Sequence, residues 1–178
     1  MKKSIFTTIS ALTFAGLCFP LLAGEEQGMP KVSMPKEFAL LKNLVGTWEG
    51  KTDMGNGEKT MEVKYHLTAG GSAVTETLMA GQPGEMESVY YKQGDSLGMT
   101  HYCVLGNHPQ MNLKKADKKS LEFEMEGVKG IQSGMEPHMH SVKLTMVDSN
   151  TLKQDWVHFI DGKSTQTVTF LLHRKMVE

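Results

Sequence analysis

From Leu44 onward, the chain is a series of short segments in which apolar and polar residues alternate. The segments are 44–54, 58–68, 72–80, 86–93, 96–105, 110–116, 120–127, 139–148, 151–160 and 163–175. Turn residues such as Gly70-Gly71, Gly94-Asp95 and Asp161-Gly162 separate them, and these pairs suit tight hairpins. Short strands at even spacing, with no helices between them, predict an all-β fold: an antiparallel up-and-down barrel of about ten strands.

One short helix is expected before the first strand. Phe38, Leu41 and Leu44 recur at helical spacing, and Pro35 stands at the first turn. Residues 25–35 are polar and contain two prolines, which is typical of a flexible lead-in. We therefore predict a single barrel domain over residues 36–178.

The N-terminal segment has the order of regions that marks exported proteins. Lys2 and Lys3 are followed by an uncharged, mostly apolar run from Ile5 to Ala23 and then by acidic residues. This order is typical of a secretory signal peptide, so residues 1–24 are expected to be removed and the mature protein to be periplasmic or secreted. The alternatives are an uncleaved membrane anchor, because the run is long, and a lipoprotein modified at Cys18.

Charge and cysteine content limit the partners and bonds available to the mature chain. Without Lys2 and Lys3, 17 of the 19 basic residues and all 20 acidic residues remain, a net charge of −3. This balance suggests no nucleic-acid or anionic-membrane partner, and no stable membrane insertion is expected once residues 1–24 are removed. Cys103 is then the remaining cysteine, so the fold must rest on its core and not on an internal disulfide.

Alternation also places one acidic residue inside the barrel. Val74, Glu76 and Leu78 share a face of segment 72–80, and the apolar pair points that face inward. A buried carboxylate must be paired, hydrogen-bonded or protonated, and desolvation is expected to raise its pKa. Two interpretations stay open: a structural network with Tyr65, Tyr90 or a histidine, and a polar contact for a ligand.

The first and last strands carry a matched pair of features. Gly46-Thr47-Trp48 opens the first strand, and Arg174, on the inward face with Phe170 and Leu172, ends the last. A barrel closes by pairing these two strands, so Trp48 and Arg174 should meet. The pair resembles the calycin superfamily, which includes the lipocalins, and the resemblance implies that the tryptophan packs under the arginine to plug one end of the barrel.

Further motifs resemble an exported bacterial barrel family of unknown function, across roughly residues 36–176. They are Gly70-Gly71-Ser72, Thr100-His101-Tyr102-Cys103, Gly106-Asn107-His108-Pro109, Met139-His140 and Asp161-Gly162-Lys163. Through Gly46-x-Trp48-x-Gly50 the chain is also distantly similar to nitrobindin, a haem-binding ten-stranded barrel. Thr52 stands where nitrobindins continue with another glycine.

His101 and Cys103 share a face of one strand but would lie about 6.5–7 Å apart, too far for a direct hydrogen bond. A nucleophile and its base would need a third residue. A buried thiol beside a hydrogen-bonded histidine is the simpler interpretation. Zinc held by His101, Cys103 and either His140 or His158 has suitable ligand types without the diagnostic spacing.

Met135-x-x-His138-Met139-His140 is a cluster of thioether and imidazole groups that would suit copper. Alternation with Val142, Leu144 and Met146 places His140 on the inward face. Haem could bind through His101, His140 or His158, whereas His173 faces outward. We nevertheless predict no cofactor, with haem and copper as alternatives.

These features favour a small-molecule-binding barrel whose interior takes a mostly apolar ligand, oriented by Glu76, Tyr90 and His101. The alternative is an enzyme that uses His101 or Glu76 as a general base in the same cavity. No catalytic triad, phosphate loop or paired-carboxylate motif is recognisable. A packed interior would contradict both hypotheses and would indicate a structural or interaction protein. The sequence names neither the ligand nor an oligomeric state.

Overall fold

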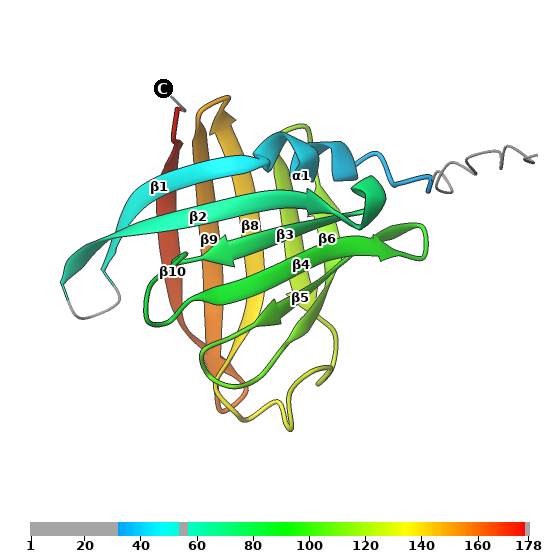
Figure 1. Cartoon of the computed structure of the whole chain (residues 1–178). Coiled ribbons are helices and arrows are strands. Elements are labelled where there is room, and N and C mark those ends of the chain that lie inside the picture. Colours follow the sequence, from blue (N-terminus) through cyan, green and yellow to red (C-terminus); the bar gives the residue numbers. More distant parts are fainter. Residues whose placement is uncertain (1–31, 54–56, 177–178) are drawn as a thin grey trace, which may run out of the picture. The chain divides into compact units, whose positions relative to one another are not determined.

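A computed structural model describes residues 32–53 and 57–176, and these form one closed barrel of ten antiparallel strands (Figure 1). The strands are β1 (Gly46–Asp53), β2 (Glu58–Thr68), β3 (Ala73–Leu78), β4 (Met86–Gln93), β5 (Ser96–Tyr102), β6 (Gln110–Ala116), β7 (Ser120–Met125), β8 (His138–Asp148), β9 (Thr151–Ile160) and β10 (Lys163–Arg174). Each strand pairs with its neighbours in sequence, and β1 pairs with β10 to close the barrel. The predicted up-and-down architecture is confirmed.

The N-terminal expectations fall largely outside this part of the chain. The expected signal peptide, residues 1–24, and most of the lead-in are not among the described residues. No helix within 32–53 and 57–176 is long and apolar enough to cross a membrane.

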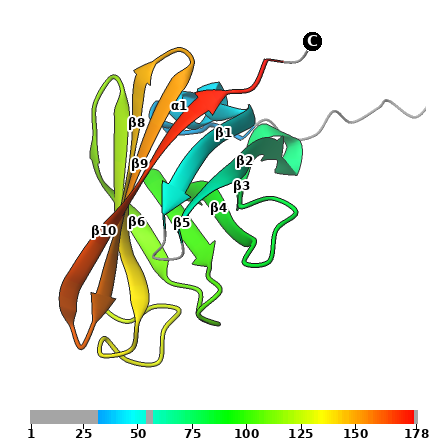
Figure 2. The same cartoon turned by 90° about the vertical axis from the view of Figure 1, so that its left-hand side faces the viewer.

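The predicted helix is α1 (Phe38–Leu44), which lies across one end of the barrel (Figures 1 and 2). Its first turn begins where the Phe38 amide donates to the Pro35 carbonyl at 3.0 Å. Phe38, Leu41 and Leu44 are buried against the barrel core. Because Leu44 belongs to α1, the first strand begins at Gly46, two residues later than the alternation predicted.

The first and last strands meet beside α1 through Trp48 and Arg174, which are paired in register. The Arg174 guanidinium carbon lies 4.2 Å from the Trp48 ring centroid. Its Nη1 and Nη2 donate to the carbonyls of Val45 at 2.9 Å and Asn43 at 2.7 Å. A side chain at Gly46, whose φ is +130°, would crowd Nη1. The guanidinium therefore ties β1 and the C-terminal end of α1 to β10.

Large side chains fill the middle of the barrel. Inward positions of every strand are occupied by buried residues, among them Trp48, Met61, Tyr65, Tyr90, Met99, Met111, Phe123, Leu144, Leu152, Trp156 and Leu172. The barrel centre is therefore taken up by the protein itself, which contradicts the predicted ligand site in the middle of the barrel. The apolar spaces next to the predicted site residue His101 lie at the end opposite α1, where the longer loops gather.

Candidate functional site

Four polar side chains form a buried network in the middle of the barrel, centred on Glu76. The Tyr65 hydroxyl and the Gln154 amide both donate to Glu76 Oε1 at 2.6 Å. The Tyr90 hydroxyl donates to Oε2 at 2.7 Å, and Gln154 Nε2 also reaches the Tyr65 oxygen at 2.6 Å. Glu76 therefore faces inward as alternation predicted, and its oxygens are bonded within the protein.

Burial and hydrogen bonding shift the pKa of Glu76 in opposite directions. Desolvation is the larger effect and raises the pKa of the carboxyl, while the bonds from Tyr65, Tyr90 and Gln154 lower it. The pKa values of Tyr65 and Tyr90 are raised well above the ordinary range, first by burial and then by the Glu76 charge. Both phenols therefore stay protonated and serve as donors.

Ser88 links this network to His101, which lies near the loop end of β5. Ser88 Oγ is 3.0 Å from His101 Nδ1, and a Ser88 hydrogen bond also lowers the pKa of Glu76. The imidazole packs against Trp156, with ring centroids 4.6 Å apart, and is 1% exposed. Trp156 in turn donates its indole N–H to Gln154 Oε1 at 2.9 Å. Burial lowers the pKa of His101 to about 4, so the ring is neutral at pH 7.

The position of the His101 proton depends on which group receives the single proton of the Ser88 hydroxyl. An ionised Glu76 can only accept, so when Ser88 donates to Glu76, the Ser88 oxygen accepts from His101 Nδ1 and Nε2 carries a lone pair. His101 Nε2 is buried without a hydrogen-bond partner among the described residues.

The imidazole of His101 lines a small apolar cavity at the loop end of the barrel. The cavity has a volume of about 20 Å³, and its other walls are Leu78, Met86, Met139, Trp156, Val168 and Phe170. A space of this size is about what one water molecule needs, yet apart from His101 and the indole of Trp156 the walls offer only apolar side chains. An unpaired buried nitrogen costs roughly 1–3 kcal/mol, which a donor on a bound molecule would recover.

A larger apolar pocket opens from the solvent beside this cavity, and Met86 lines both. The pocket measures about 280 Å³, and Met61, Met79, Met86, Pro83 and Val104 supply its apolar walls. Cys103 Sγ lies 4.0 Å from Met86 Sδ. Burial raises the pKa of the Cys103 thiol, so the group stays protonated and packs against Met86 as a small apolar side chain.

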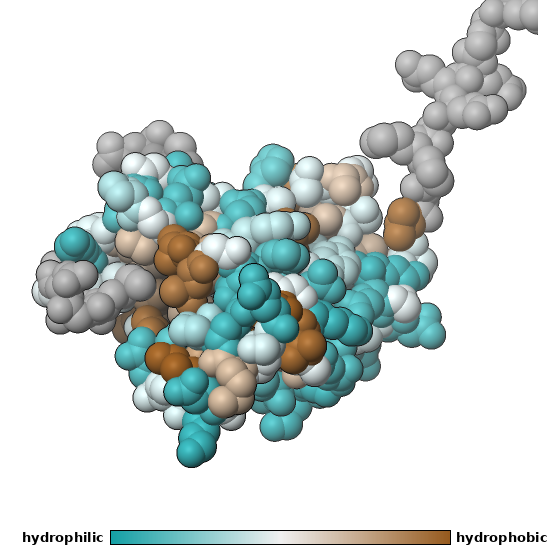
Figure 3. Space-filling model, turned by 90° about the horizontal axis from the view of Figure 1, so that it is seen from below, coloured by the Kyte–Doolittle hydropathy of each residue, from teal (hydrophilic) through white to brown (hydrophobic). Residues whose placement is uncertain are grey.

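Four apolar side chains on the loops at this end of the barrel are exposed. Val104, Leu105, Val128 and Met135 are 58%, 48%, 51% and 58% exposed. Viewed from this end, apolar side chains stand in separate clusters among hydrophilic ones (Figure 3). These side chains and the methionine-lined pocket offer apolar surface to a molecule that arrives from solvent.

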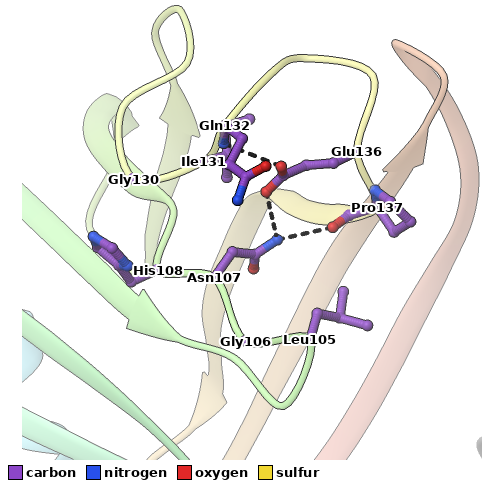
Figure 4. A pocket seen from close by; sticks show the side chains of 9 residues that line it. All are labelled: Leu105, Gly106, Asn107, His108, Gly130, Ile131, Gln132, Glu136 and Pro137. Carbon is purple, nitrogen blue, oxygen red and sulfur yellow. Dashed lines mark hydrogen bonds between the residues drawn. The ribbon is translucent and has the colours of Figure 1, made fainter.

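Loops 103–109 and 126–137 are held together across a second hollow of about 520 Å³ (Figure 4). Asn107 Nδ2 donates to Glu136 Oε1 at 3.1 Å and to the Pro137 carbonyl at 2.9 Å. Gly130, at φ +80°, passes so close to the His108 carbonyl that any side chain would overlap it. These contacts fix the loops on one side of the opening.

His140 lies on the outer side of the barrel, so its predicted inward position is wrong. The β8–β9 register shifts between Met139 and Ser141, which makes His140 an extra residue that reverses the alternation. Its ring stacks on Phe159, with centroids 3.9 Å apart at 11°. Phe159 is three residues from the inward-facing Trp156 and therefore faces outward.

The structure does not bring the proposed zinc ligands His101, Cys103 and His158 together. His101 Nε2 has no bond to Cys103, and His158 Nδ1 lies 3.0 Å from Thr165 Oγ1. Within the described residues, no three His, Cys, Asp or Glu side chains form a metal-binding group. The cavity beside His101 measures about 20 Å³, far below the roughly 300–1,000 Å³ of small-molecule pockets.

Sequence reasoning missed Ser88 and Gln154, the two residues that extend the Glu76 network. A signal was present for Gln154, which stands at an inward position between Leu152 and Trp156. A polar residue in an inward row needs a partner, as Glu76 does. Ser88 stands between Met86 and Tyr90 on the buried face of β4 and carried the same signal.

No family model and no curated protein matches this sequence. Among solved structures, the chain is similar to a redesigned β-barrel, at 12% sequence identity and a TM-score of 0.39, with 82% of this chain and 100% of that chain covered. The description of the fold rests on the strand pairing, and the calycin and nitrobindin resemblances rest on sequence motifs alone.

Proposed function

We propose that this protein is an exported barrel that binds a small, mostly apolar molecule at its open end. The observation that carries the proposal is the unpaired Nε2 of His101 on an apolar cavity wall. We infer that Ser88 donates to Glu76 and accepts from His101 Nδ1, which leaves Nε2 as an acceptor. The ligand should therefore present a hydroxyl or N–H group on an apolar body.

The methionine side chains are flexible and allow the site to change shape. Met86 stands between the solvent-accessible pocket of about 280 Å³ and the inner cavity of about 20 Å³, and it lines both. Methionine has three flexible torsions and repacks at low cost. Rotation of Met86 would join the two spaces and let a ligand in the pocket reach His101.

The buried network supports binding over catalysis. Glu76 and Tyr90, which were candidate ligand contacts, bond to each other and act in this proposal by holding His101 through Ser88. His101, with a pKa lowered to about 4, is a weak base, and the nearby Cys103 thiol has a raised pKa. Neither group suits a nucleophilic or general-base role at neutral pH.

Phenol and toluene make a matched pair of probes, because they differ in the hydrogen-bond donor and hardly in shape. Binding can be followed by NMR of protein labelled at the methionine methyl groups. We expect phenol to shift the Met86 and Met139 signals and to bind more tightly than toluene. His101→Phe should remove that difference. Equal affinity of both probes for the wild type, or no shift with either, would contradict the proposal.

A further inference from the structure

Two histidines at the start of β8 lie together on the outer side of the barrel, away from the proposed ligand site. His138 Nε2 and His140 Nδ1 are 3.3 Å apart. Residues two apart on a regular strand share a face and lie about 6.5–7 Å apart. These two rings lie closer than that, at the β-bulge where the β8–β9 register shifts beside His140. The two imidazoles of the sequence motif that suggested copper therefore lie together.

Both rings are held in place by other groups. His138 is 2% exposed, and its Nδ1 lies 2.7 Å from the Glu136 carbonyl. A carbonyl can only accept, so the proton of neutral His138 is on Nδ1 and Nε2 carries a lone pair. The ring of His140 is fixed by its stacking on Phe159. A backbone carbonyl behind a ring nitrogen is the usual outer support of metal-binding histidines.

The separation of the two nitrogens matches a chelate. Two imidazole nitrogens at about 2.0–2.1 Å from a tetrahedral ion are about 3.3–3.4 Å apart. We propose that His138 Nε2 and His140 Nδ1 bind one divalent ion of the kind that prefers imidazole, Zn²⁺ or Cu²⁺. The His140 proton moves to Nε2 when the ion binds, so the ring stays neutral.

The carboxylate that acts on His140 is Glu124, on the neighbouring strand. Burial and His138 lower the pKa of the His140 ring, and the negative charge of Glu124 acts in the opposite direction. The thioethers of the motif are separated from the pair, because Met139 lines the inner cavity and Met135 is 58% exposed on its loop. Among the described residues, no third His, Cys, Asp or Glu side chain joins the two histidines in a metal-binding group. Water molecules would therefore fill the remaining coordination positions of the ion.

Calorimetric titration of the untagged protein with zinc chloride tests the site. We expect one ion per chain, and at least tenfold weaker binding after His140→Gln. His173→Gln changes an exposed histidine elsewhere and should leave the affinity within twofold. Cys103→Ser should also leave it within twofold, which separates this site from a thiol site.

A spectroscopic measurement identifies the ligands independently of affinity. With one equivalent of Cu²⁺, electron paramagnetic resonance of the wild type should show coupling to two imidazole nitrogens, and His140→Gln should reduce this to one. No binding by the wild type, unchanged binding by His140→Gln, or loss of binding in Cys103→Ser would overturn the proposal. None of these results bears on His101, so the ligand site is tested separately.

Discussion

Acidification should destabilise this barrel through His101. Burial lowers the pKa of this imidazole from 6.5 to about 4, so between these values the unfolded chain takes up a proton that the folded protein does not. The stabilising contribution is present above pH 6.5 and is lost as the pH falls toward 4. A shift of this size corresponds to about 3 kcal/mol at 1.36 kcal/mol per unit.

Urea unfolding of the wild type and His101→Phe, at pH values from 7 to 4, measures this contribution. Phenylalanine keeps an aromatic ring against Trp156 but cannot titrate. The free energy of unfolding of the wild type should fall by about 3 kcal/mol more than that of the variant. Other titrating groups, Glu76 and His140 included, are present in both proteins and cancel in the difference. His173→Gln, which removes an exposed histidine, serves as the control. Parallel pH profiles for wild type and His101→Phe would refute the reasoning.

Three further predictions concern stability and can be checked by the same unfolding assay. Trp48→Ala should lower the free energy of unfolding by about 3–5 kcal/mol, and Arg174→Lys should lower it by less. The loss in the double variant should be smaller than the sum of the two single losses; simple additivity would contradict the stacking contact. Because the pKa of Glu76 is raised, its contribution to stability should decline as the pH rises from 4.5 through that pKa, so the free energy of unfolding of the wild type relative to Glu76→Gln should fall over this range; parallel profiles would place the titration elsewhere. Gly130→Ala should cost about 1–3 kcal/mol more than Gly106→Ala, which has a similar φ but open space around it; equal costs would mean that the close backbone approach is unimportant.

Much of the architecture could be predicted, because alternation and turn residues are local signals. The strands begin and end within a few residues of their predicted limits, and β5 stops early at Tyr102, where Cys103 begins a turn closed by the Gly106 amide. The inward position of Glu76 followed from the apolar residues on either side of it. These predictions needed only the two-residue period of a strand.

Features that depend on packing and register could not be read from the sequence. The bulge at His140 inserts one residue without a glycine or proline to mark it, and it reverses the faces that alternation assigns. The filled interior depends on how side chains as large as Trp156 and Tyr90 fit across the barrel, which no single strand reveals. The unpaired nitrogen of His101 likewise depends on Ser88, which is adjacent only in space.

The protonation of the His101 ring tests the central claim most directly. In protein labelled with nitrogen-15 in histidine, NMR at pH 7 should show a proton on Nδ1 and none on Nε2. Saturation with phenol should shift the Nε2 signal as it accepts a hydrogen bond, and should leave the Nδ1 signal almost unchanged. A proton on Nε2 in the free protein, or an Nε2 signal that does not respond to phenol, would contradict a ligand site at this histidine.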